Sequence, residues 1–165
     1  MTDKELMAFA MTEARAAGRR GDVPVGAVVA RDGRLLAAAG NEREASRDPT
    51  AHAEVLALRR AAAVLGTWRL TGCSVFATLE PCTMCAGALV AARVERVSFA
   101  AFDPKAGACG SLYNLCVDPR LNHELVVESG IAAGEAGALL SDWFATHLRD
   151  KAVGGAVLDV GMIIL

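Results

Sequence analysis

Apolar and polar positions in the first third of the chain follow first a helical period and then a strand pattern. Apolar residues at helical spacing predict a helix over 3–19. Valine- and alanine-rich segments over 23–30 and 35–39 predict two strands. Asp32 and Gly33 lie between these segments and supply turn chemistry, so the two strands are expected to form a hairpin.

The rest of the chain alternates between helix and strand patterns. The expected order is a polar loop over 41–50, a helix over 51–65, a strand over 73–79, a helix over 81–92, a strand over 94–101, a loop over 103–122 with a helical turn near 112–116, a strand over 125–128 and a last helix over 132–148. A loop as long as the one after the fourth strand is usually functional. The alternation predicts an α/β sandwich whose second half is largely parallel.

Composition indicates a globular protein of one domain, over residues 1–150. Hydrophobic residues make up 53% of the 165 residues and aromatic residues only 5%, so alanine and small aliphatic side chains supply most of the core. The formal net charge of -2 gives no global basic field to attract a nucleic acid. A local basic patch would be enough for such a partner.

The N-terminal residues and the cysteines bear on where the protein works. No basic segment followed by an apolar run opens the chain, and no apolar run approaches the roughly 20 residues that span a bilayer. We therefore expect a cytoplasmic protein with no membrane partner. Five cysteines, an odd number, make a disulfide framework a poor explanation and favour a metal or catalytic role.

Two short segments contain the residues with metal chemistry. His52 and Glu54 fall at the beginning of one predicted helix, and Cys82 and Cys85 at the beginning of the next. Cysteines three residues apart in a first helical turn lie on one face, so both sulfurs reach one ion. The exposed amides and the helix dipole there favour thiolates, the form that binds metal. Two thiolates and an imidazole predict one zinc ion per chain, with the fourth tetrahedral position open.

Glu54 is predicted to move protons in this site. It lies two residues from the ligand His52, so it can stand beside the metal without binding it. An open zinc site lowers the pKa of a bound water to about 7. We expect Glu54 to accept a proton from that water, to protonate the ring nitrogen next to the attacked carbon, and later to protonate the departing amine. The products are ammonia and a carbonyl group.

A structural zinc site or a redox pair is the alternative explanation for the two cysteines. A closed structural site needs a fourth ligand, and the candidates are Cys73, Cys109, Cys116, His123 and His147. Against this alternative, His-x-Glu followed after a strand by Pro-Cys-x-x-Cys is the known signature of zinc deaminases of nucleobases. We therefore favour the catalytic site, and we interpret the remaining cysteines as small core residues.

Longer stretches of the chain resemble one family. They are Val23–Val28, Asp48–Glu54, Thr78–Ala88, Asp103–Gly107, Gly110–Leu112 and Leu121–His123. Over roughly residues 5 to 144 the chain resembles the bacterial tRNA-specific adenosine deaminases, in the zinc-dependent cytidine and deoxycytidylate deaminase superfamily. Cytosine, guanine and cytidine deaminases share the zinc motif, whereas the Asp48–Glu54 run and the Asn122-His123 pair point to the tRNA enzymes.

The resemblance implies both a fold and an activity. The fold is a three-layer α/β/α sandwich around a mixed five-stranded sheet, as in cytidine deaminases. The activity is hydrolysis of adenosine to inosine at the wobble position of a tRNA anticodon. The family also implies a homodimer in which both subunits help to bind the anticodon loop.

Residues that match the family's base and ribose contacts follow from the same resemblance. Asn41 matches an asparagine that hydrogen-bonds the flipped base, and Asp103 matches an acid that contacts a neighbouring ribose hydroxyl, the group that distinguishes RNA from DNA. Val25, Leu79 and the backbone near Ala53 match the walls of the base pocket. Without the resemblance, these would be a turn asparagine, a capping aspartate and ordinary core residues.

Further matches concern the rest of the anticodon loop. Lys105 is expected to meet a phosphate, although a loop lysine is by default solvated. Asn122, His123 and Phe144 match positions that hold flipped loop bases, and Phe144 is equally a core residue by helical periodicity. These residues complete the predicted substrate-binding set.

The C-terminal end departs from the family. Members usually end in a helix with several Arg and Lys residues, whereas here only Arg149 and Lys151 follow a nearly uncharged segment. An atypical apolar tail is expected over 151–165, too short to span a membrane. The departure bears on RNA affinity and leaves the zinc chemistry unchanged.

Two other functions compete with the tRNA enzyme. A deaminase of a free base or nucleoside, of the guanine or cytosine type, would use the same metal, and it would close the Asp103 loop or the C-terminal segment over the base. A non-catalytic zinc-stabilised RNA-binding or partner subunit is the other rival. Such proteins commonly lose the proton-shuttle glutamate, and Glu54 is present.

Overall fold

The computed structural model describes residues 1–153, with side chains described through residue 148. Its elements are α1 (Asp3–Arg19), β1 (Gly26–Arg31), β2 (Arg34–Gly40), α2 (Arg43–Ser46), α3 (Ala53–Leu65), β3 (Cys73–Leu79), α4 (Thr83–Ala92), β4 (Arg96–Ala101), the 3-10 turn η1 (Leu115–Val117), β5 (Val126–Ser129) and α5 (Ala133–Val153). Each helix and strand expected from the sequence is present, with bounds shifted by a few residues.

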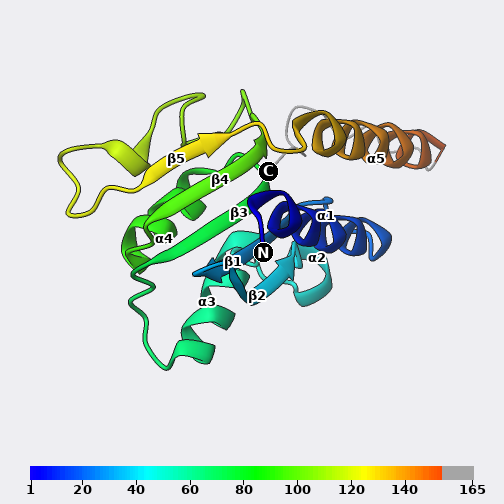
Figure 1. Ribbon diagram of the computed structural model, residues 1–165. Helices are drawn as coiled ribbons and strands as arrows, with labels where there is room; N and C mark the ends of the chain where they lie inside the picture. The colour runs from blue at the N-terminus through cyan, green and yellow to red at the C-terminus, as the bar shows by residue number, and fades with distance from the viewer. Residues whose placement is uncertain (154–165) are drawn as a thin grey trace.

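The strands form one mixed sheet in the order β2-β1-β3-β4-β5. β1 pairs antiparallel with both β2 and β3, so the N-terminal hairpin lies at one edge. β3, β4 and β5 are mutually parallel, and Figure 1 shows them side by side with α4 behind them. The predicted five-stranded mixed sheet with a parallel second half is therefore confirmed.

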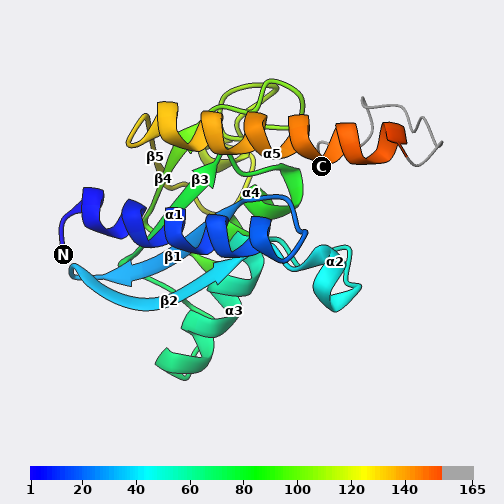
Figure 2. The same ribbon diagram turned by 90° about the vertical axis from the view of Figure 1, so that its right-hand side faces the viewer.

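Helices cover both faces of the sheet, which gives the three expected layers. On one face, α1 and the first turns of α5 pack against Val28, Phe76 and Ala100. On the other face, α3 and α4 pack against the alternate positions of the same strands, including Val29 and Val75. Figure 2 shows α1 and α5 on one side of the sheet and α3 on the other. Successive strand residues point to opposite faces, so both faces of a central strand are apolar here.

Close contact between α1 and β1 depends on Gly26. A Cβ atom at this position would lie 2.0 Å from the Ala10 carbonyl oxygen and 2.6 Å from the Ala14 amide nitrogen. Backbone atoms cannot yield to such a contact, so only glycine allows α1 to pack this closely. Helix α1 therefore covers β1, the strand that begins directly after Val25.

The sequence predicts a polar loop over residues 41–50, whereas the structure forms the short helix α2 within this segment. Its first turn is capped from a distance: the buried Asp22 carboxylate accepts hydrogen bonds from the Glu44 amide (2.7 Å) and the Ala45 amide (3.3 Å). Side-chain oxygens that accept from the free amides of a first turn stabilise a helix. This contact with Asp22, which is distant in the sequence, thus stabilises a helix for which the local sequence gives no signal.

At the C-terminal end, α5 continues to Val153, five residues beyond the predicted end at residue 148. The atypical tail predicted over 151–165 is described only where it continues α5, and residues 154–165 lie outside the described residues. Within residues 1–153, no helix combines the length and the apolar character needed to cross a membrane.

Candidate active site

Three side chains with metal-binding atoms meet where two helices begin. His52 is the N-cap of α3 and Cys82 is the N-cap of α4, and Cys85 lies in the first turn of α4. Both helices follow loops, and the second loop leaves the end of β3 at Leu79. The amide ends of two helices therefore surround the cluster, which favours negatively charged sulfur.

The distances within this cluster fit a tetrahedral zinc ion. His52 Nδ1 lies 3.6 Å from Cys82 Sγ and 3.5 Å from Cys85 Sγ, and all three ligand atoms lie within 4.8 Å of one another. Zinc bonds of about 2.3 Å to sulfur and about 2.0 Å to nitrogen, at tetrahedral angles, require a nitrogen–sulfur separation of about 3.5 Å. Both nitrogen–sulfur separations therefore fit the ion.

The cluster has three ligands and not four. Within residues 1–148 it is the one group of three or more His, Cys, Asp or Glu side chains placed to hold a metal. The candidates for a fourth structural ligand (Cys73, Cys109, Cys116, His123 and His147) are not part of it. Three protein ligands with an open position are typical of a catalytic zinc site.

The three ligand side chains shift one another's pKa values. A hydrogen bond with Cys85, supported by His52, lowers the pKa of Cys82 to about 4. The contact with Cys82 raises the pKa of Cys85 and that of His52. The cluster thus favours the thiolate form of Cys82, which is the form that binds a divalent cation, and metal binding releases protons from such ligands.

A pocket, which we call the central pocket, opens beside this cluster. It is lined by Val23, Val25, Asn41, Arg43, His52, Ala53, Glu54, Leu79, Glu80, Cys82 and Asp103. The carboxylate of Glu54 is 4% exposed, and burial raises its pKa. A carboxylate whose pKa is raised takes up and releases a proton nearer to neutral pH, as a general acid–base requires. Six other predicted residues line this one pocket with Glu54: His52, Cys82, Asn41, Asp103, and the two apolar wall residues Val25 and Leu79.

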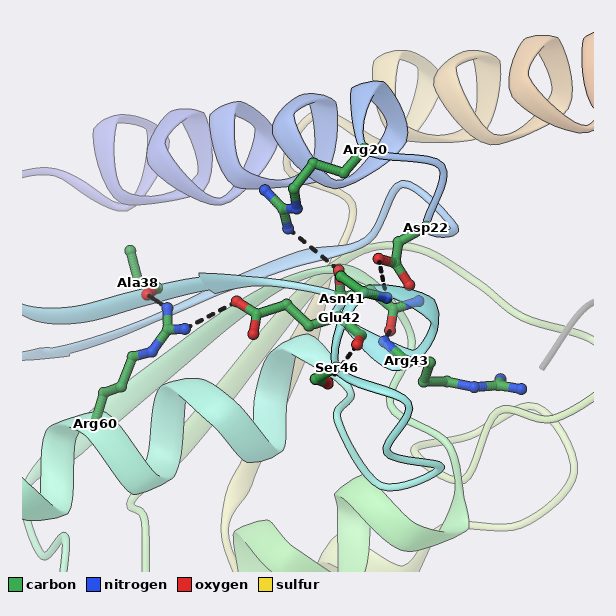
Figure 3. A network of polar contacts seen from close by, with 9 residues as sticks. Arg20, Asp22, Ala38, Asn41, Glu42, Arg43, Ser46 and Arg60 are labelled. Carbon is green, nitrogen blue, oxygen red and sulfur yellow. Dashed lines mark hydrogen bonds and ion pairs between the residues drawn. The ribbon is translucent and has the colours of Figure 1, made fainter.

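Asn41 is held in the wall of the central pocket by several weak contacts. Its Nδ2 donates to the Val23 carbonyl and its Oδ1 accepts from the Arg43 amide, both at 3.3 Å. Arg20 donates to the Asn41 carbonyl at 3.3 Å (Figure 3). One amide hydrogen and one oxygen lone pair of Asn41 therefore have no partner within the described part of the chain, and both are available to a ligand.

Asp103 also lines the central pocket, with one oxygen occupied. Its Oδ1 accepts hydrogen bonds from the amides of Lys105 (3.0 Å) and Ala106 (3.3 Å), which folds the loop after β4. The capping interpretation of Asp103 is thus correct as far as Oδ1 is concerned. Its second carboxylate oxygen has no hydrogen bond to any described residue and is free to accept one from a ligand.

A second cavity continues from the central pocket towards α5. This outer cavity has a volume of about 290 Å³ and shares Val23, Leu79 and Asp103 with the central pocket. Lys105 and Phe144 line it, as do apolar residues of α5. Two more predicted residues therefore lie next to the central pocket, one cationic and one aromatic.

Asn122 and His123 lie elsewhere. His123 Nε2 contacts the Val94 carbonyl at 2.7 Å, just before β4 begins, whereas the central pocket lies where β3 and β4 end. His123 lines a separate pocket with Arg93 and Glu95, and Asn122 is exposed. The loop after Asp103 takes the chain from one end of the sheet to the other, so a single chain does not bring this pair to its own central pocket.

Glu80 is a pocket residue that sequence reasoning missed. Its carboxylate is 2% exposed and accepts hydrogen bonds from the amides of Asp103, Cys109 and Ser111. It stands directly before Pro81 in the motif that contains the zinc ligands, and that position was the available signal. Arg43 was missed as well, because α2 was not expected; its guanidinium points away from the polar network in Figure 3.

The other cysteines are core residues, as predicted. Cys73, Cys109 and Cys116 are free thiols and are at most 3% exposed. Burial raises the pKa of Cys73, so this residue stays a neutral thiol. Cys109 and Cys116 contact each other at 3.5 Å between sulfur atoms, away from the zinc ligands.

Comparisons with known proteins identify the family of this chain. The model of the cytidine and deoxycytidylate deaminase zinc-binding region matches residues 1–101, which contain the three ligands and Glu54. A tRNA-specific adenosine deaminase of Bacillus subtilis is 49% identical over 152 residues, which cover 92% of this chain and 94% of the relative.

Two solved structures share the fold. One comes from a study of A-to-I editing by tRNA:A34 deaminases at the wobble position of transfer RNA; it is 44% identical, has a TM-score of 0.80, and the match covers 82% of this chain and 99% of that one. A guanine deaminase of Nitrosomonas europaea is 27% identical, with a TM-score of 0.71 over 86% of this chain and 84% of that one. The resemblance read from the sequence is therefore confirmed, and this chain belongs to the tRNA-specific adenosine deaminases, within the family that has the cytidine and deoxycytidylate deaminase zinc-binding region.

Proposed function

We propose that this protein converts adenosine to inosine, by hydrolysis, at the wobble position of a tRNA anticodon. The observation that carries the proposal is the central pocket, which Glu54 lines together with His52 and Cys82 of the metal cluster and with Asn41 and Asp103. The names of the relatives narrow the substrate, since two kinds of comparison lead to enzymes of tRNA adenosine.

The residues divide the chemistry between metal binding and proton transfer. His52, Cys82 and Cys85 would hold the zinc ion, which supplies a water activated for attack at neutral pH. Glu54 accepts one proton from the attacking water and passes it to the ring nitrogen beside the attacked carbon. It then takes the second proton from the newly bonded hydroxyl group and delivers it to the amino group, which leaves as ammonia while the carbonyl forms. Its burial supports this role, because desolvation raises the pKa of Glu54 and so favours the protonated form that a general acid needs.

The base itself is recognised by the opposite wall. Val25 and Leu79 offer apolar surfaces on which a purine ring packs. Asn41 uses its unoccupied amide hydrogen and lone pair to bind the polar edge of the base. A base must leave its stack to reach such a pocket, which a loop of single-stranded RNA allows at low cost.

Groups around the pocket entrance bind the neighbouring nucleotides. The free oxygen of Asp103 accepts a hydrogen bond from a ribose 2′-hydroxyl, which DNA lacks. Lys105 and Phe144 in the outer cavity meet a phosphate and a stacked base. The outer cavity continues from the central pocket, and this supports an extended substrate over a single enclosed base.

We also propose that the protein forms a homodimer. Asn122 and His123 lie far from the central pocket of their own chain, so we expect them to serve the site of a second copy. A tRNA substrate also supports the expected cytoplasmic location. The oligomeric state is measured by light scattering of the zinc-loaded protein, and a monomer that is fully active on RNA would contradict the shared site.

The substrate is tested directly by ammonia release. The zinc-loaded protein is incubated with an RNA anticodon stem-loop that carries a wobble adenosine and, separately, with guanine, cytosine, adenosine and cytidine. The stem-loop should be converted far faster than any small molecule. Faster release from guanine or cytosine would instead favour the free-base deaminase, to which the guanine deaminase fold is similar. Zinc-loaded protein inactive on every substrate would favour the non-catalytic subunit.

A further inference from the structure

Glu80 is a buried carboxylate without a cationic partner. Its side chain is 2% exposed, and within residues 1–148 no Lys, Arg or His forms an ion pair with it. A buried charge is costly unless hydrogen bonds compensate for it. The charge of Glu80 must therefore be compensated by hydrogen bonds.

Donors from one loop surround both oxygens. Oε2 accepts from the Asp103 amide at 2.9 Å and from the Ser111 hydroxyl. Oε1 accepts from the amides of Cys109 (3.1 Å) and Ser111 (2.9 Å). Converging backbone amides form a concave anion-binding site, and here the anion is a side chain of the protein. All four donors lie between residues 103 and 111, which we call the rim loop.

Gly107 is matched to this arrangement. A Cβ atom at Gly107 would lie 2.2 Å from the Glu80 carboxyl carbon and within 2.5 Å of both its oxygens. The carboxylate could escape such a clash only by leaving its four donors. The rim loop is thus shaped around Glu80, and the absence of a side chain at 107 is part of that fit.

The same segment joins the rim loop to the zinc ligands. The Ala108 amide donates to the Pro81 carbonyl at 2.9 Å, and Cys82 forms a β-bridge with Gly107. Glu80 therefore links two parts of the central pocket: the zinc ligand two residues after it and Asp103, whose amide it holds.

We propose that Glu80 is a positioning residue, which holds the rim loop so that Asp103 and Lys105 present their side chains to the substrate. The proposal rests on the proposed function for the identity of that substrate. Glu80 has no role in proton transfer, because its oxygens are occupied by loop donors. Its removal should weaken substrate binding more than the chemical step, since all four donors to Glu80 lie in the rim loop, whereas Glu54 and the zinc ligands are also held by the first turns of α3 and α4.

The test compares Glu80→Gln with wild-type enzyme, both loaded with zinc. A glutamine offers one acceptor oxygen and turns an NH₂ group towards amide donors, so it cannot satisfy the loop. Amide hydrogen exchange at residues 103, 109 and 111 should become at least about tenfold faster, because charge-assisted bonds are lost. The KM for the stem-loop should rise about tenfold, with kcat and bound zinc within about threefold of wild type.

The matched control is Glu128→Gln, another glutamate, which pairs with Arg96 at the opposite end of β4. It should change neither the exchange of the rim-loop amides nor the KM. Unchanged rim-loop exchange in Glu80→Gln would overturn the proposal, and so would an unchanged KM or an equal loss of kcat and zinc. If the wild-type enzyme leaves the stem-loop unconverted, the proposed function fails, while amide exchange still decides the role of Glu80.

Gly107→Ala provides a second route if Glu80→Gln does not fold. Its methyl group displaces the carboxylate, so its KM and amide exchange should change as those of Glu80→Gln do. In a double-mutant cycle with Glu80→Ala, the Gly107→Ala change should have little further effect, because the clashing group is gone. Additive effects of the two changes would contradict the proposed fit.

Discussion

The central pocket has two walls that the chain builds in different ways. The zinc wall is formed by His52, Glu54 and Cys82, and we include with it Cys85, which completes the metal cluster. All four residues lie within the first turns of α3 and α4 or at their N-caps. The substrate wall includes Asn41 and Asp103, which lie in loops. Contacts from residues remote in the sequence hold these loops: Arg20 contacts Asn41, and Glu80 holds the backbone of Asp103.

Because the two walls are built differently, they should also differ in how well they tolerate mutations. Helix geometry fixes the spacing of the zinc wall, and each of its residues performs one indispensable chemical task. Many weak hydrogen bonds hold the substrate wall, so a single change there should weaken binding by degrees. Mutations in the zinc wall should therefore abolish turnover, whereas mutations in the substrate wall should alter which substrate is preferred.

The largest effect is expected from the zinc ligands. Cys82→Ala or Cys85→Ala leaves two ligands, which cannot hold a tight open site, so bound zinc and activity should both disappear. Elemental analysis of the purified variants measures the metal. The control Cys73→Ala removes a thiol that lies in the core and should keep about one zinc per chain. Full zinc content in both ligand variants would refute the assignment.

Glu54→Gln should have the next largest effect. The amide keeps the size of the side chain but cannot accept and release protons, so zinc and fold are retained while kcat falls. General acid–base groups contribute about 10²- to 10⁴-fold, and a residue with several proton transfers should lie at the upper end. Single-turnover rates on the RNA stem-loop measure the loss. A variant that keeps near wild-type turnover would mean that another group moves the protons.

Asp103→Asn probes the substrate wall and should have a smaller, selective effect. The neutral amide can still hydrogen-bond and no longer repels the phosphate backbone, so the preference for an RNA loop over a matched DNA loop should narrow. Wild-type enzyme should prefer the RNA loop, because Asp103 loses its 2′-hydroxyl partner in DNA. Single-turnover rates on the two loops give the ratio. The role of Asp103 would be rejected if the ratio were the same in both proteins.

The smallest effect is expected far from both walls. Arg96 pairs with Asp3 at 2.7 Å and holds the pKa of that carboxyl below its usual value. The pair is partly exposed, so Asp3→Asn should lower the free energy of unfolding by less than about 1 kcal/mol at pH 7. Because the folded pKa is the lower one, this stabilisation is present above pH about 4 and is lost as the pH falls through the folded value. Urea unfolding at several pH values measures it, and activity on RNA should stay unchanged. A stability difference that grows on acidification would contradict the sign.

The two walls also differ in how much of them the sequence predicts. The zinc wall follows from spacing alone, because His52, Glu54, Cys82 and Cys85 each belong to a short motif at a helix start. The mixed five-stranded sheet and both helical layers likewise follow from local patterns and from the resemblance, whereas the order of the strands comes from the structure. Boundaries shifted where a cap or a turn decides the first residue, as at α3 and α4.

The substrate wall depends on contacts that local patterns do not contain. Asp22 stabilises α2 by accepting a hydrogen bond from an amide 22 residues away, and Glu80 accepts hydrogen bonds from amides 23 to 31 residues away. The sequence separates these partners, and only the folded sheet brings them together. For the same reason Asn122 and His123, matched by resemblance alone, lie outside the pocket of their own chain.

The central claim is that this pocket edits one adenosine of an RNA loop. The most direct measurement uses an anticodon stem-loop with adenosine at the wobble position and at other loop positions, followed by nuclease digestion and mass spectrometry of the products. The account predicts inosine at the wobble position alone, formed far faster than inosine from free adenosine. Inosine spread evenly over the loop, or an intact loop alongside rapid conversion of free guanine, would contradict it.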